Sequence, residues 1–207
     1  MRRFLVSRLG KVVLSFANYS FYPSAMRRLL LCLLCVALSG CAVPPSAVDH
    51  VLVAPGITLE LPSPAELGRS VDVVQLVTAR HDGESFVFEG RLLIRPDRLV
   101  LVGSDGMGRR AMTVTWASGK IDVERASWLP DNLRPENILA DIVLLYWPEA
   151  VVRKSIKGAV LTQSVGARSV GDAIFVSWQG EPWSGGSRLR NIPWDYELEI
   201  QSVMVGP

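Results

Sequence analysis

The chain has 207 residues, of which 49% are hydrophobic, so it holds enough apolar material for one well-packed domain rather than two. Six of the 22 Lys and Arg residues lie in residues 1–40, which contain no acidic residue, so the rest carries 16 basic residues against 20 acidic ones, a formal charge of −4. An acidic chain with scattered basic residues offers no electrostatic footprint for phosphate backbones, which argues against nucleic acid as a partner.

The stretch that begins at Met26 has the pattern of an export signal. Two arginines follow the methionine and precede an apolar run of about ten residues, Leu29–Leu38, too short to span a bilayer. Residues 1–25 are therefore either an over-long basic leader or the product of a start codon placed too early, and we favour the second. Cys32 and Cys35 lie inside the run without a second pair of ligands, so we interpret them as small apolar filler.

The signal ends in Leu38-Ser39-Gly40-Cys41, which resembles the lipobox of bacterial lipoproteins. The resemblance implies cleavage before Cys41 and palmitate-type acylation of that cysteine, and three acyl chains would hold the protein permanently on a membrane. Residue 42 is Ala, without the Asp of an inner-membrane retention signal, which implies the periplasmic face of the outer membrane. We therefore expect a signal peptide over residues 1–40, a lipidated tether rich in Pro and small residues over 41–56, and a single domain over 57–207.

Alternating apolar and polar residues dominate the chain beyond the tether. Turn sequences such as His81-Asp82-Gly83-Glu84 and Ser118-Gly119 separate the alternating runs, so residues 70–126 predict a meander of antiparallel hairpins. The pattern resumes in Ile174–Trp178 and in Tyr196–Gln201. These observations predict a mostly β fold in which about ten antiparallel strands form one curved, open sheet.

One helix interrupts the strands. Pro135 and Glu136 have the composition of a helix start, and Pro148 ends the segment after Trp147. Most of the helix circumference is apolar, so the helix must be covered on more than one side. We expect it to plug or cover the concave face of the sheet.

Three segments, together with the lipobox and the order of the elements, carry a family resemblance: Gly106-Met107-Gly108-Arg109-Arg110, Leu139-Ala140-Asp141-Ile142-Val143-Leu144 and Tyr146-Trp147-Pro148. The chain resembles the uncharacterised LolB-like bacterial lipoproteins, a domain-of-unknown-function family often encoded beside aryl-polyene biosynthesis genes. The resemblance covers most of residues 57–205. It implies an open half-barrel like that of LolA and LolB, with a helical lid over an apolar cavity for acyl chains.

On this basis we expect a set of apolar side chains to form the cavity or its lid: Ile138, Leu139, Ile142, Leu145 and Trp147 of the helix, with Phe88, Trp116 and Trp178 of the sheet. Met107 is the lone apolar residue of a Gly-rich hairpin tip. The tip is either an ordinary turn or, as the apolar residue of the equivalent LolB loop implies, a point of membrane contact. Two further tryptophans, Trp128 and Trp183, lie in expected loops, where packing and a place at the cavity mouth are both open interpretations.

No nucleophile motif or metal-ligand spacing is present, so we predict no catalytic residues, no metal, no cofactor and no enzyme activity. The predicted function is a lipoprotein that binds or transfers an acyl-type or polyene-type lipid, with the membrane, that lipid and a periplasmic carrier protein as partners. Two alternatives stay open: a structural or assembly factor that contacts a partner protein, and an accessory of lipid-modifying enzymes.

Overall fold

A computed structural model describes residues 50–129 and 133–205 of the chain, and all of these lie in one compact unit, residues 45–207. A ten-stranded antiparallel sheet forms its framework, with the strand order β7-β6-β5-β4-β3-β13-β12-β11-β10-β9. The first half of the sheet is a meander of consecutive hairpins, as the turn sequences predicted. Its strands are β3 (Val71–His81), β4 (Glu84–Arg95), β5 (Arg98–Asp105), β6 (Arg110–Ala117) and β7 (Lys120–Arg125).

Two helices follow the meander, and a second series of strands then completes the sheet. The helices are α2 (Pro135–Tyr146) and α3 (Glu149–Ser155), and the strands are β9 (Leu161–Ser164), β10 (Ala167–Val170), β11 (Ile174–Gln179), β12 (Gly186–Asn191) and β13 (Tyr196–Met204). The last strand, β13, pairs with β3 from Tyr196↔His81 to Met204↔Val73. This long pairing joins the two halves of the chain into one sheet.

A separate three-stranded sheet consists of β1 (Val51–Ala54), β2 (Ile57–Leu59) and β8 (Ile156–Lys157). A short 3-10 helix, η1 (Pro64–Leu67), connects it to β3. Residues 51–54, expected to belong to the tether, are thus a strand of the domain. Val51, Val53 and Ala54 are at most 2% exposed, because their apolar side chains join the core beside α2.

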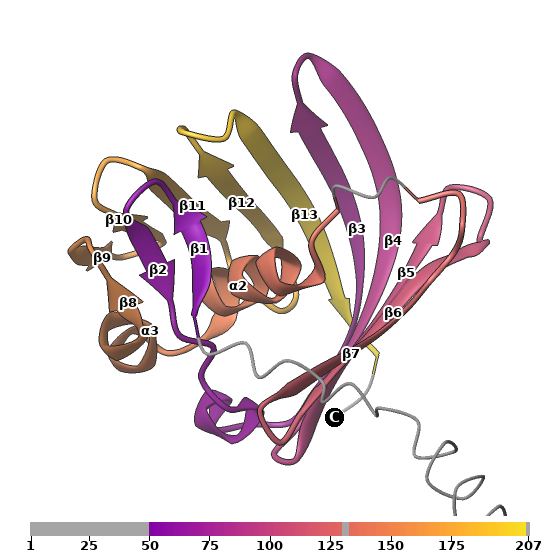
Figure 1. Cartoon of the computed structure of the whole chain (residues 1–207), viewed down its shortest axis with the longest axis horizontal. Coiled ribbons are helices and arrows are strands. Elements are labelled where there is room, and N and C mark those ends of the chain that lie inside the picture. Colours follow the sequence, from indigo (N-terminus) through magenta and orange to yellow (C-terminus); the bar gives the residue numbers. More distant parts are fainter. Residues whose placement is uncertain (1–49, 130–132, 206–207) are drawn as a thin grey trace, which may run out of the picture. The chain divides into compact units, whose positions relative to one another are not determined.

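The large sheet curves strongly, and α2 lies against its concave side next to β1 and β2 (Figure 1). We call this concave side the inner face and the opposite side the outer face. Side chains alternate between the faces along each strand, with the buried residues directed inward. The hairpin turns fall at the predicted sequences, and Asp82, Gly83, Ser118 and Gly119 adopt the positive φ angles that such tight turns require.

These features confirm the predicted fold class, a mostly β architecture with an open antiparallel sheet of ten strands accompanied by helices. The predicted helix is also present, since α2 runs from Pro135 to Tyr146 and ends just before Pro148. None of the helices in the described ranges combines the length and apolar character needed to cross a bilayer. Cys41 and residues 1–40 lie outside the described residues.

Candidate functional site

The inner face is fully packed at one end. One row of facing residues across four neighbouring strands, Val71, Ile94, Leu99 and Trp116, is at most 3% exposed. The next row, made of Val73, Leu92, Leu101 and Val114, is at most 8% exposed. We call this the closed end of the inner face. A ligand could lie between these two rows only by displacing buried core side chains.

Toward the β3–β4 hairpin the inner face opens. On β4 the inward side chains change from buried Leu92 to half-buried Phe88 and then to Phe86, which is 54% exposed. On β13 the change is from buried Ile200 to half-buried Leu198. We call the apolar surface of Phe86, Phe88, Leu198 and the half-buried Met112 the open end. The exposed part of a large aromatic side chain on the concave face of a sheet is apolar surface that can still contact a ligand.

Two facing glycines separate the packed rows from the open end. Gly90 of β4 pairs with Gly103 of β5 on the inner face, so neither strand contributes a side chain at this position. A Cβ atom on Gly90 would lie 3.6 Å from Leu101, and one on Gly103 would lie 3.4 Å from Met112. The flexible side chains of Leu101 and Met112 therefore lie where side chains at these two positions would be.

The C-terminal end of α2 is held by two side chains of the sheet. Arg168 of β10 donates to the carbonyl oxygens of Leu144 and Trp147 at 2.7 and 2.9 Å, and Trp178 donates its indole N–H to Leu145 at 3.1 Å. The last carbonyls of a helix have no partner within the helix, and a cation there also interacts favourably with the helix dipole. Burial lowers the pKa of Arg168 to about 10, and the guanidinium stays charged at neutral pH.

A buried polar cluster fixes the same part of α2 against the middle of the sheet. Gln75 of β3 donates to the Tyr146 hydroxyl at 2.7 Å and to Ser202 at 3.1 Å. The ring of Tyr146 stacks on Trp183, with centroids 4.2 Å apart. Trp183 is only 6% exposed. It is therefore a packing residue and does not lie exposed at a cavity mouth.

In the described residues, two hydrogen bonds join the part of α2 from Pro135 to Asp141 to the sheets. Asn137 donates to the Leu52 carbonyl oxygen at 3.2 Å, and the Asp141 carboxylate accepts a hydrogen bond of 2.8 Å from the Tyr196 hydroxyl of β13. Burial raises the pKa of Asp141 to about 7, although the bond from Tyr196 opposes the shift. Burial, and then the neighbouring Asp141, raises the pKa of Tyr196 as well. Since Tyr196 and Leu198 share one face of β13, this titratable pair lies beside the open end.

The β5–β6 loop exposes the residue predicted to touch a membrane. Met107 is 83% exposed at its tip, and Asp105 shapes the loop by accepting the backbone N–H groups of Arg109 and Met107 at 2.9 and 3.0 Å. The hydrogen bonds to the Asp105 carboxylate, above all the one from the Arg109 backbone N–H, lower the pKa of Asp105. The Arg109 guanidinium lies 5.1 Å from the ring centroid of Trp128, which is 48% exposed. An exposed thioether, an exposed indole and a cation therefore occur together here.

The structure collects the sequence-predicted cavity residues in one core. Ile138, Phe88 and Trp178 are half-buried and pack against it, whereas Leu139, Ile142, Leu145, Trp147 and Trp116 are buried within it. Trp116 and Trp147 contact each other with ring centroids 6.3 Å apart. Sequence reasoning did not single out Phe86, Arg168 or the pair of Tyr196 with Asn191, whose side chain binds the Val53 carbonyl oxygen. Phe86 was visible only as the first member of an alternating run.

Comparison with known proteins identifies the family of this chain but gives no activity for that family. Residues 72–204 of the 207, more than half of the chain, match the profile of a family described as "Protein of unknown function (DUF3261)". The matched segment begins in β3 and ends in β13, so it spans the whole ten-stranded sheet and α2. No curated protein matches the chain.

Proposed function

Since the chain belongs to the DUF3261 family of proteins of unknown function, we propose its role from its geometry: it is an outer-membrane lipoprotein, anchored by lipid on Cys41, that binds an acyl-type or polyene-type chain at the open end of the inner face. The observation that carries the proposal is the change from buried to exposed apolar side chains along β4, from Leu92 to Phe88 to Phe86. The LolB-like resemblance of the sequence supports the same interpretation of the curved sheet and its helix.

The ligand would lie on apolar surface that the folded protein leaves incompletely covered. Phe86, Phe88 and Leu198 line one side, and Ile138 is a half-buried residue on the N-terminal half of α2. Complete burial of one large apolar side chain contributes about 1.5–3 kcal/mol, and these side chains are already partly buried. Most of the binding free energy would therefore come from burial of the ligand's own methylene groups, at about 0.8 kcal/mol each. Because Gly90 and Gly103 have no side chains, the ligand would extend inward between them only if the Leu101 and Met112 side chains moved.

Solvent extraction of purified residues 42–207, followed by lipid mass spectrometry, tests whether the domain carries an apolar chain. We expect a co-purifying acyl or polyene chain at a substantial fraction of one per protein. A domain that is free of lipid after gentle purification, and that does not take up a fluorescent fatty acid, would contradict the proposal and favour a structural role.

Matched variants of the β3–β4 hairpin locate the binding surface. Phe86 and Val87 are adjacent and similarly exposed, at 54% and 53%, but Phe86 is on the inner face and Val87 on the outer face. We expect Phe86→Ser to weaken fluorescent fatty acid binding about tenfold or more and Val87→Ser to leave it unchanged. Equal effects of the two substitutions would place the ligand elsewhere.

The anchor is tested separately, because lipid binding by the domain does not depend on it. We expect Cys41→Ser to abolish palmitate labelling and to leave an uncut precursor in the producing cell. Normal processing of that variant would remove the outer-membrane part of the proposal while leaving the lipid-binding part intact.

A further inference from the structure

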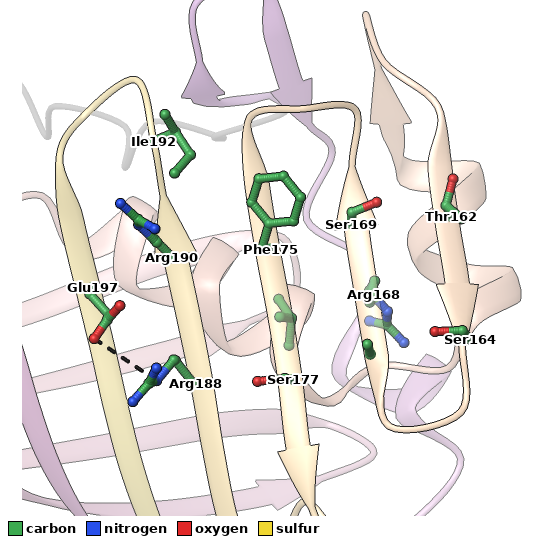
Figure 2. A pocket seen from close by; sticks show the side chains of 12 residues that line it. Thr162, Ser164, Arg168, Ser169, Phe175, Ser177, Arg188, Arg190, Ile192 and Glu197 are labelled. Atoms are coloured by element: carbon green, nitrogen blue, oxygen red, sulfur yellow. Dashed lines mark ion pairs between the residues drawn. The ribbon is translucent and has the colours of Figure 1, made fainter.

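The outer face of the sheet carries a hollow that the lipid proposal does not use. It has a volume of about 600 Å³ and lies over β9 to β13 (Figure 2). It exists because the outward positions of three neighbouring strands carry small residues, most of them with hydroxyl groups: Thr162 and Ser164 of β9, Ala167 and Ser169 of β10, and Ser177 of β11. A hydroxyl both donates and accepts hydrogen bonds, so the hollow offers polar partners beside the apolar surface of Phe175 and Ile192, which suits a ligand with both polar and apolar surface.

One large aromatic side chain rises from this floor. Phe175 of β11 is 44% exposed and faces Ser169 across one strand pair and Arg190 across the other. Figure 2 shows the ring between these two side chains, with Ile192 above them. Phe175 therefore presents an accessible aromatic surface next to a guanidinium group and a hydroxyl group.

The hollow also has a surplus of positive charge. Glu197 is bound by Arg80 at 3.0 Å and contacts Arg188 at 3.9 Å, while Glu199 accepts hydrogen bonds from the same two arginines. These four residues balance one another. Arg190, the cross-strand neighbour of Glu197, forms no ion pair with any residue in the described ranges, and its side chain is exposed. An unmatched guanidinium in a concave, hydroxyl-lined surface is a site for an anionic group.

We propose that this hollow binds an acidic saccharide, a sugar ring that carries a phosphate or carboxylate group. The anionic group binds Arg190, the apolar C–H surface of the ring lies on Phe175, and the sugar hydroxyls exchange hydrogen bonds with Ser169, Ser177 and Thr162. The two faces of the sheet would then serve different ligands, since the open end is on the inner face. The site is independent of the proposed lipid function.

Glucose 6-phosphate, glucose and inorganic phosphate are suitable probes, because they separate the ring from the charge. The protein is residues 42–207, which contain the whole core of the compact unit. Each probe is titrated at low salt while the backbone amide signals of Ser169 and Arg190 are followed by NMR. We expect saturable binding of glucose 6-phosphate in the millimolar range, at least fivefold tighter than binding of phosphate and tighter still than binding of glucose.

Three variants test the assignment of roles. Arg190→Ala should weaken glucose 6-phosphate binding about tenfold, and Phe175→Ala should weaken it about fivefold while leaving phosphate binding unchanged. Arg98→Ala removes an exposed arginine of β5 outside the hollow and should have no effect. Unchanged thermal unfolding midpoints show that the variants fold. No binding at these signals, equal affinity for phosphate and the sugar phosphate, or equal losses in Arg98→Ala and Arg190→Ala would each overturn the proposal.

Discussion

The two ends of α2 are attached to the sheet in different ways. Arg168, Trp178 and the Gln75–Tyr146 bond hold the C-terminal end. From Pro135 to Asp141 the bonds to the sheets come from Asn137 to Leu52 and from Tyr196 to Asp141. The C-terminal end contacts the closed end through the rings of Trp147 and Trp116, and Tyr196, the partner of Asp141, neighbours Leu198 of the open end on one face of β13. Under the proposed function, the C-terminal end of α2 therefore serves packing, and the part near Asp141 borders the proposed binding surface.

This difference indicates where the protein can accommodate a ligand without losing stability. Displacing the C-terminal end of α2 would strip partners from three buried carbonyl oxygens and from a buried glutamine, each at a cost of about 1–3 kcal/mol. Displacing the part from Pro135 to Asp141 breaks fewer of the recorded hydrogen bonds, and one of them belongs to a carboxyl group whose charged form burial already disfavours. If the proposed lipid binding holds, this part of α2 is the one we expect to move first.

The largest effect on stability is expected for Arg168→Met, which tests the hydrogen bonds at the C-terminal end of α2. The substitution leaves the carbonyl oxygens of Leu144 and Trp147 without their donor, partly offset because a buried cation is also removed. We expect a loss of about 2–4 kcal/mol in the free energy of unfolding, measured by urea denaturation. Arg190→Met, the same change at an exposed arginine of β12, is the control and should stay within about 0.5 kcal/mol of the parent. If both variants were equally stable, the hydrogen bonds from Arg168 to α2 would contribute nothing to the free energy of unfolding.

The next largest effect on stability concerns Asp141 of α2 and depends on pH. Because the pKa of Asp141 is raised to about 7 in the folded protein, the folded state binds this proton more tightly than the unfolded chain does. The contribution of Asp141 to stability is therefore fully present below pH 4 and is lost as the pH rises through 7. Asn at this position keeps an acceptor for Tyr196 and carries no charge.

We therefore expect Asp141→Asn to match the parent near pH 4 and to exceed it by on the order of 2 kcal/mol at pH 8. Urea denaturation at the two pH values measures the difference. Asp172→Asn alters an exposed aspartate in the turn between β10 and β11 and should follow the parent at both pH values. A constant gap between Asp141→Asn and the parent across this range would show that Asp141 does not titrate near neutral pH.

The sequence predicted the large-scale architecture because its local signals agree with its tertiary structure. Phe86 to Ile94 alternate in a stretch that forms β4, and Asp82-Gly83 supplies the turn that starts it. α2 was recognisable because Pro135 and Pro148 bracket an apolar run. In these segments the side chains that determine the local conformation also determine which face is buried, so short-range patterns were sufficient.

The rest depended on contacts between distant segments. Residues 51–54 resemble a tether, and only burial beside α2 makes them a strand. Arg168 has the composition of an exposed strand residue, yet it is 5% exposed because it reaches helix carbonyls 21 and 24 positions earlier. The outer-face hollow likewise arises from side chains of five strands at once. No periodicity within a single window reports such pairings.

The smallest effect on stability, and the most selective one, is expected at the β5–β6 tip. Met107 is 83% exposed and the loop is shaped by Asp105 rather than by the methionine, so Met107→Glu should leave the unfolding free energy within about 0.5 kcal/mol of the parent. A methionine inserted into lipid contributes about 1.5–3 kcal/mol, and the half-exposed Trp128 near it suits a membrane interface. Loss of that insertion should lower co-sedimentation of residues 42–207 with anionic liposomes about tenfold.

Val165→Glu places the same charge at the exposed tip of the β9–β10 hairpin and should not change liposome binding. Equal losses in the two variants would mean that added negative charge alone repels the protein from the liposomes, and the β5–β6 tip would then be an ordinary turn.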